Sequence, residues 1–307
     1  MSQQNTSSFD YQIWIKESRA AAADLIKHAA SLRRELFASG DLSSFLSILI
    51  RLHQYDYRNL LLILQQYPSA TQLGTFKNWQ SLLPSGQVLQ NKWKGKSIDL
   101  LAPFTEKSSS GIHFLTWYRV TQYDISQTNV TDYPKEKSPY VLDQLHLPYL
   151  TQSLLAVLYH HFQRKVKYLP RSSSILQTSL SFYITDQHVV MRSDSTPIQR
   201  LQILSEAMSR LNIADHSSLS NKFQVMFSQC VCHCLFDIWL LPGYFKPPMA
   251  SSVISTFPES QQAQFLDLLQ RSVRLLNESV TCCYLYLRQS DEYISDLDSD
   301  VLSHLYP

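Results

Sequence analysis

The stretch from Asp56 to Trp79, DYRNLLLILQQYPSATQLGTFKNW, constrains the fold more than any other part of the chain. Its apolar side chains recur at helical spacing, at Tyr57, Leu60, Leu61, Leu64 and Tyr67. Asp56 can cap this helix, and Pro68 ends it because proline lacks a backbone donor. Phe76 and Trp79 follow on a second, short helix beside basic and polar residues. The pattern predicts a buried helix that leads into an aromatic anchor.

Composition indicates a folded protein without a general affinity for polyanions. Hydrophobic residues make up 44% of the 307 residues, and the net charge is only +2, so attraction to phosphate has to be local. The N-terminus has no signal-peptide pattern, and no run of apolar residues is long enough to span a membrane. The five cysteines have no disulfide-like spacing. We therefore expect a cytoplasmic protein without membrane contact.

The order of several short motifs resembles the N-terminal domain of ArdC-like (LtrC-like) antirestriction proteins over residues 40–128. The first group comprises Tyr57, Asn59, Leu61, Leu62, Ile63, Pro68, Ala70, Thr71, Phe76 and Trp79. The second group comprises Tyr123, Asp124, Ser126, Gln127 and Thr128. In that family the domain binds single-stranded DNA and precedes a zinc-metallopeptidase-like domain. The chain departs from the family at the turn around Gly95, where a glycine and a glutamate are missing and a tryptophan is gained.

The expected fold class is α+β. A helix-rich N-terminal domain with a β-hairpin or small sheet spans 1–128, a proline-bearing linker spans 129–148, and a mostly helical, zincin-like α+β domain with an acidic tail spans 149–307. Helices are expected over 11–39, from Asp41 or Ser43, from Asp56, over 76–83, 151–164, 197–211, 221–241 and 258–288. Gly40 is expected to end the first helix, a hydroxyl cap before Pro197 to start the helix over 197–211, and the segment around Gly74 to be a polar loop. Strands are expected over 98–101 with an end at Pro103, and over 113–122, 176–184 and 187–192.

Single-stranded DNA is the expected partner of the N-terminal domain. Binding it requires cations for phosphates and flat side chains on which unpaired bases stack. The candidate residues with these properties are Lys77, Trp79, Lys92, Trp93, Lys94, Lys96 and Arg119. The motifs that carry the resemblance add Tyr57, Arg58, Asn59 and Gln127 as predicted DNA-binding residues. The alternative is that Trp79 belongs to the core and the lysines form a solvated hairpin tip.

The resemblance also implies a zinc site of the His-Glu-x-x-His type in the second domain. Two histidines four apart face one side of a helix, and the glutamate acts as general base. Here the matching positions are Ser205, Glu206 and Ser209, and Lys222 stands where a ligating glutamate is expected. A serine hydroxyl is a poor zinc ligand and an ammonium group repels the ion. The resemblance thus predicts a degenerate site without metal or cofactor, unless the helix is an ordinary amphipathic one.

Cys230, Cys232, His233 and Cys234 have the composition of a metal cluster but not its spacing. Residues two apart on a helix point in roughly opposite directions, so the thiols do not converge. An apolar segment of this kind favours packing of neutral cysteines in the core. His160 and His161 are expected at the surface.

Together these features predict a non-enzymatic single-stranded-DNA-binding protein of a mobile element, with an antirestriction or anti-defence role during conjugation. A host restriction or defence protein is a second candidate partner. The alternative is a protein–protein interaction scaffold that inhibits a host factor, and a third reading is an active metal-dependent peptidase. The sequence leaves the oligomeric state open.

Overall fold

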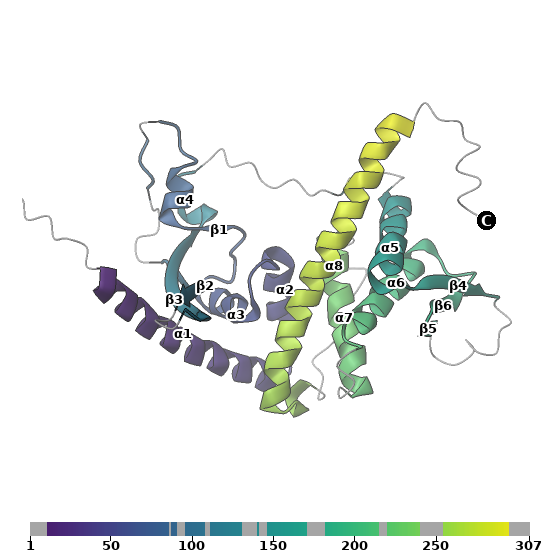
Figure 1. Cartoon of the computed structure of the whole chain (residues 1–307), viewed down its shortest axis with the longest axis horizontal. Coiled ribbons are helices and arrows are strands. Elements are labelled where there is room, and N and C mark those ends of the chain that lie inside the picture. The colour runs from purple at the N-terminus through teal and green to yellow at the C-terminus, as the bar shows by residue number, and fades with distance from the viewer. Residues whose placement is uncertain are drawn as a thin grey trace, which may run out of the picture. The chain divides into compact units, whose positions relative to one another are not determined.

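The structure is a computed structural model that describes residues 11–85, 87–90, 96–107, 111–130, 140, 146–170, 182–214, 220–239 and 254–294. The chain divides into two compact units, one of residues 1–135 with 250–263 and one of residues 136–249 with 264–307. Each unit combines helices with one three-stranded sheet (Figure 1). The expected α+β class is confirmed.

The first unit surrounds an antiparallel sheet of order β1-β3-β2. Helix α1 packs on β2 and β3, and α3 packs on β2 and on α2. The side chains buried between them are mainly leucines and isoleucines of α2 and α3. The elements are α1 (Tyr11–Ser39), α2 (Ser43–Leu52), α3 (Tyr57–Gln66), β1 (Leu73–Gly74), α4 (Phe76–Gln80), β2 (Ile98–Lys107), β3 (His113–Asp124), η1 (Ile125–Gln127) and η3 (Ile254–Thr256).

The ends of the first helices follow their capping residues. Gly40 has a φ of 69° after α1, the left-handed conformation that glycine adopts without strain. The Asp56 carboxylate accepts hydrogen bonds from the backbone N–H groups of Arg58 (2.9 Å) and Asn59 (3.3 Å). For α2 the expected cap residue, Asp41 or Ser43, is wrong, because the N-cap position is occupied by Leu42. The Asp41 carboxylate accepts a bond from the Ser43 N–H at 2.8 Å. The bonds from Ser43 lower the pKa of Asp41.

Two side-chain amides of α3 bind the outer backbone edge of β2. Asn59 donates to the Leu101 carbonyl (2.9 Å) and accepts from the Leu101 N–H (2.8 Å). Gln66, two helical turns further on, does the same for Asp99, at 3.0 and 2.9 Å. Since an edge strand has unpaired backbone groups, these four bonds replace a neighbouring strand. They fix α3 along β2.

Strand β2 is longer than the sequence predicts. It continues through Pro103 to Lys107 and pairs with β3 along its whole length. Proline lacks an N–H group and is compatible with a strand only where that group would point away from the sheet. The edge position of β2 supplies this condition. The prediction that the strand ends at Pro103 was therefore wrong.

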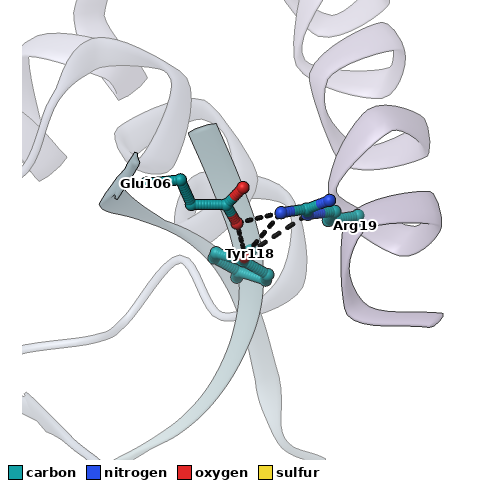
Figure 2. A network of polar contacts seen from close by, with 3 residues as sticks. All are labelled: Arg19, Glu106 and Tyr118. Atoms are coloured by element: carbon teal, nitrogen blue, oxygen red, sulfur yellow. Dashed lines mark hydrogen bonds and ion pairs between the residues drawn. The ribbon is translucent and has the colours of Figure 1, made fainter. Parts of the chain in front are cut away.

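Helix α1 holds the far end of the β2–β3 hairpin. The Arg19 guanidinium pairs with Glu106 and donates to the Tyr118 hydroxyl at 3.1 Å, and the Tyr118 hydroxyl also donates to Glu106 (Figure 2). Trp14, five residues earlier on α1, stacks parallel to the Tyr118 ring with centroids 6.0 Å apart. The aromatic and ionic contacts together attach the first turns of α1 to the sheet.

Trp79 of α4 anchors that helix to β1 and β3. Its indole N–H donates to the Tyr123 carbonyl at 2.9 Å, and the side chain is 3% exposed. The ring lies so close to Gly74 that a Cβ atom there would be 2.7 Å from Trp79 Cε2. Gly74 is therefore required by the close approach of the tryptophan to the backbone of β1. Strand β1 itself was expected to be a loop.

The second unit contains a mixed sheet of order β4-β6-β5, in which β4 runs parallel to β6 and β5 antiparallel to it. Thr196 caps α6 through a bond from the Gln199 N–H, and Pro197 takes the first helical position, as predicted. The elements are α5 (His146–Phe162), β4 (Lys165–Leu169), β5 (Phe182–Ile184), β6 (His188–Arg192), α6 (Pro197–Asn212), α7 (Asn221–Ile238) and α8 (Glu259–Ile294). The first residues of α8, up to Ala263, are grouped with the first unit.

The second unit differs from expectation in two places. Strand β4 was not predicted, and α5 begins at His146, inside the segment expected to be a linker. Of the strand expected over 176–184, the structure describes only the part from Phe182 onward. Among the described helices, none combines the length and hydropathy needed to cross a membrane.

Replacing Asn59 by leucine tests the edge bonds of β2. The change leaves the buried N–H and carbonyl of Leu101 without partners, so we expect a loss of about 2–4 kcal/mol in the free energy of unfolding. Gln66→Leu is the matched control, because it removes the same kind of bonds at an exposed position where water can replace them. Urea denaturation measures both. Equal losses would contradict a special role of the buried amide.

Replacing Gly74 by alanine should destabilise the first unit by about 1–3 kcal/mol, because the added methyl overlaps the Trp79 ring. Trp79→Phe should cost less in the Gly74→Ala background than in the parent, since the smaller ring relieves the overlap. Thermal unfolding of the four proteins gives this coupling. Additive effects would show that the two residues do not meet.

Candidate nucleic-acid interface

The predicted DNA-binding residues divide into three groups. Lys92, Trp93 and Lys94 lie outside the described residues. Asn59, Trp79 and Gln127 are buried in the first unit, and Tyr57 is nearly so. The remaining four are accessible or half-buried: Arg58, Lys77, Lys96 and Arg119.

The buried members serve the fold. Asn59 binds β2, and Trp79 offers no ring face to a base because it is enclosed between α4 and β1. Gln127 donates to the Lys96 carbonyl at 2.6 Å and accepts from the Asp124 N–H at 2.7 Å. Burial and existing bonds engage these three side chains within the fold, so the candidate interface is built on the exposed residues.

The buried carboxylate of Asp124 organises the backbone beside the candidate interface. One oxygen accepts from the N–H groups of Thr71 (2.7 Å) and Gln72 (2.9 Å), and the other from the Ser126 N–H (3.0 Å). Several bonds to one carboxylate offset the cost of burying its charge. The network joins the segment before β1 to the end of β3.

A polar groove of about 450 Å³ opens beside this network. Its lining combines amide and hydroxyl side chains with the backbone of β1, and the residues are Gln72, Leu73, Gly74, Asn78, Trp79, Ser81, Leu82 and Gln122. We call it the β1 groove. Amides can donate to and accept from the edges of unpaired bases. Within the groove, Asn78 and Gln122 already accept bonds, from the Thr75 N–H and the Tyr55 hydroxyl, which fix their orientation.

Phe76 and Lys77 begin α4 and directly precede Asn78, which lines the β1 groove. Phe76 is 49% exposed, and Lys77 is exposed as well. The pair supplies an aromatic face and a cation at one place, the combination that single-stranded nucleic acid requires. Trp79 was predicted as a stacking residue and Phe76 was not. In the structure Trp79 is the buried anchor of α4, whereas Phe76 faces solvent.

A second group of basic and aromatic side chains lies on β3 and α3. The Arg58 guanidinium is 5.4 Å from the ring centroids of both Tyr57 and Trp117. Arg119, with 48% of its side chain exposed, forms an ion pair with Asp99 at 3.8 Å. Trp117 was not predicted as a site residue. Arg58 and Arg119 are partly neutralised or stacked already, so they offer less to a phosphate than Lys77 does.

Lys96 is exposed at the start of the segment that leads into β2, and its carbonyl is the acceptor for Gln127. Gln127, the last residue of η1, completes a capping box with the N-cap residue Asp124 directly after β3. The backbone of Lys96 is thereby fixed to the same network that supports the β1 groove.

The degenerate metal positions of the second unit lie on α6. Ser205 and Ser209 are fully buried, and the Ser209 hydroxyl donates to the Ser205 carbonyl at 2.6 Å. Glu206 accepts from Gln202 at 3.0 Å and lies 4.0 Å from Arg210. Hydroxyl groups enclosed in a helix interface do not fit the imidazole ligands of a zinc site. The side chain of Lys222 lies outside the described residues.

The cysteines of α7 are core residues. Cys230, Cys232 and Cys234 are fully buried, and burial raises the pKa of all three thiols, that of Cys230 to about 12. They therefore stay protonated, as expected for small apolar side chains. Among the residues that the structure describes, no group of three or more His, Cys, Asp or Glu is arranged to hold a metal ion.

Comparison with solved structures returned the antirestriction protein ArdC from the R388 plasmid in two forms. The Mn(II)-bound form is 12% identical, with a TM-score of 0.45, over 78% of this chain and 98% of that chain. The metal-free form is 9% identical, with a TM-score of 0.42, over 74% and 85%. No protein-family model and no curated protein matches. The family that the sequence motifs resemble is thus also the family of these structures, and their low similarity assigns no residue role to this chain.

Proposed function

We propose that this protein binds single-stranded DNA through its first unit, catalyses no reaction, and acts as an antirestriction protein of a mobile element in the cytoplasm. The observation that carries this proposal is the exposed Phe76–Lys77 pair beside the polar β1 groove. The bases of a single strand can stack on Phe76 while a phosphate meets Lys77, and the groove amides can bond base edges.

The geometry favours single-stranded over double-stranded DNA. In a duplex the bases are already stacked on each other, so Phe76 has no base face to meet. The net charge of +2 gives little general attraction to a duplex. Sequence preference should be weak, because every base has a face that can stack.

A titration of the full chain with a labelled oligo-dT tests the two residues separately. Phe76→Ala should weaken binding about fivefold or more at every salt concentration, because stacking contributes about 1–3 kcal/mol and releases no counterions. Lys77→Ala should reduce the slope of log affinity against log salt by about 0.7. If Lys92, Lys94 and Lys96 also contact phosphates, replacing all three should lower the slope by about 2.

Matched controls are available in the same unit. Phe114→Ala removes an aromatic side chain of similar exposure, and Lys16→Ala removes an exposed lysine of α1. Both controls should bind like the parent. The proposal fails if Phe76→Ala and Lys77→Ala also bind like the parent, or if duplex DNA binds as tightly as the single strand.

An interaction scaffold is the second candidate, and exposed apolar side chains favour it. Trp14 and Phe104 both contact the Tyr118 ring, at 6.0 and 5.4 Å between centroids. Other large apolar residues at this end of the hairpin are also exposed, namely Ile112, Phe114 and Leu115. Exposed apolar side chains in one region are typical of protein-binding surfaces. A transfer assay with unmodified plasmid separates the candidates. DNA binding predicts that Phe76→Ala reduces protection and Phe104→Ser does not, whereas the scaffold predicts the opposite.

We also propose that the second unit is not a metallopeptidase. Ser205 and Ser209 stand at the ligand positions implied by the family resemblance, and their hydroxyls are enclosed between helices. The purified full chain should therefore contain less than about 0.1 zinc per molecule by elemental analysis, because neutral hydroxyls bind zinc poorly. About one tightly held zinc or manganese per chain would overturn this part of the proposal.

A further inference from the structure

One long segment of the second unit has only positive charges. Between Asp143 and Asp186 the sequence contains no Asp or Glu but four Lys and Arg residues. In a chain with a net charge of only +2, this is a marked local excess. The excess lies where α5 passes into β4 (Figure 1).

The passage from α5 to β4 has an unusual backbone. Gln163 has a φ of 54°. This value lies in the left-handed region of the backbone angles, which residues other than glycine and asparagine rarely adopt. This turn reverses the chain, so that the Lys165 ammonium lies 5.9 Å from the centroid of the Tyr159 ring. Such conformations cost of order 1–3 kcal/mol and often occur where a surface has a role.

Strand β4 presents cations and aromatic rings along the edge of its sheet. Lys165 and Lys167 are exposed, and their spacing of two residues points both side chains to the same side. Tyr168 is 45% exposed on the other side, where the Arg200 guanidinium lies 5.4 Å from its ring centroid. Tyr159, next to Lys165, is 48% exposed. We call these five residues, which lie on the two sides of the edge strand β4, the β4 surface: Tyr159, Lys165, Lys167, Tyr168 and Arg200.

The cations of the β4 surface have no carboxylate partner among the described residues. Arg200 donates to the carbonyls of Ser195 and Ser193, at 3.0 and 3.1 Å, and keeps its charge uncompensated. The Arg164 guanidinium donates to the carbonyls of Phe162 and Gln163 at the C-terminus of α5, at 3.3 and 3.4 Å, where the helix dipole attracts positive charge. This helix end does not account for Lys165 and Lys167, which lie further on in β4. Their charges are available to a ligand.

We propose that the β4 surface is a second contact for single-stranded nucleic acid, separate from the β1 groove. Cations alone would suit any polyanion, but each tyrosine has one ring face next to a cation and nearly half of its side chain open, which suits the stacking of an unpaired base. An anionic lipid surface would instead require an apolar face to insert. This inference rests on the proposed function, and the residues involved belong to the other unit.

Cross-linking of the full chain to an oligonucleotide that contains 5-iodouracil tests the proposal. Mass spectrometry should locate a cross-link at Tyr159 or Tyr168, and the cross-link should persist when Phe76 and Lys77 are replaced by alanine. The Lys165→Ala/Lys167→Ala variant should lose the cross-link, and its salt slope should fall by about 1.4, or about 0.7 per phosphate contact. Oligo-dT and oligo-U in parallel distinguish DNA from RNA.

The charge-matched control is Arg271→Ala/Arg274→Ala, which removes two exposed cations from α8 of the same unit. This control should keep the cross-link and the slope. Cross-links confined to the first unit, with an unchanged slope in the lysine variant, would overturn the β4 surface and leave the proposed function intact. Cross-links confined to the β4 surface, with an unchanged slope in Lys77→Ala, would overturn the β1 groove instead. Lysine-dependent binding to phosphatidylserine vesicles without any oligonucleotide cross-link would also overturn the inference.

Discussion

The Asp124 carboxylate is the interaction on which the candidate interface depends. It is buried, and it is stable there only because backbone N–H groups of Thr71, Gln72 and Ser126 donate to it. These bonds join β1 to the end of β3, and Gln127 extends the network to Lys96. Two walls of the β1 groove, Gln72 and Gln122, lie on the segments that the carboxylate joins. A groove formed by segments far apart in sequence requires such a bond to keep its width.

Three residues of the family-like motifs that were predicted to bind DNA have buried side chains. Asn59, Trp79 and Gln127 stand in those motifs, and each one bonds the backbone of another segment. In one sequence, a residue that the fold needs cannot be distinguished from a residue that contacts a ligand. Burial makes the distinction, and burial depends on which strand lies beside which helix.

Local signals predicted local structure well. The caps at Asp56 and Thr196 and the turn at Gly40 need only neighbouring residues, and all three are found as expected. Strands β1 and β4 were missed because their partners come later in the chain: β1 pairs with the end of β3, and β4 pairs with β6. Short strands of this kind have little periodicity of their own. The position of Phe76 at the surface likewise follows from the packing of Trp79 on Gly74, which no local pattern reveals.

The charge distribution explains why two modest surfaces suit this chain better than one strong one. With a net charge of only +2, the whole chain attracts a nucleic acid weakly over a long distance, so each contact has to depend on a few cations and rings. Two weak contacts on one chain act on the same strand at a high effective concentration, provided that the strand is long enough to reach both. Binding should then increase steeply with oligonucleotide length, while each surface by itself releases a short strand quickly. A protein of this kind would favour long exposed single strands over short single-stranded gaps.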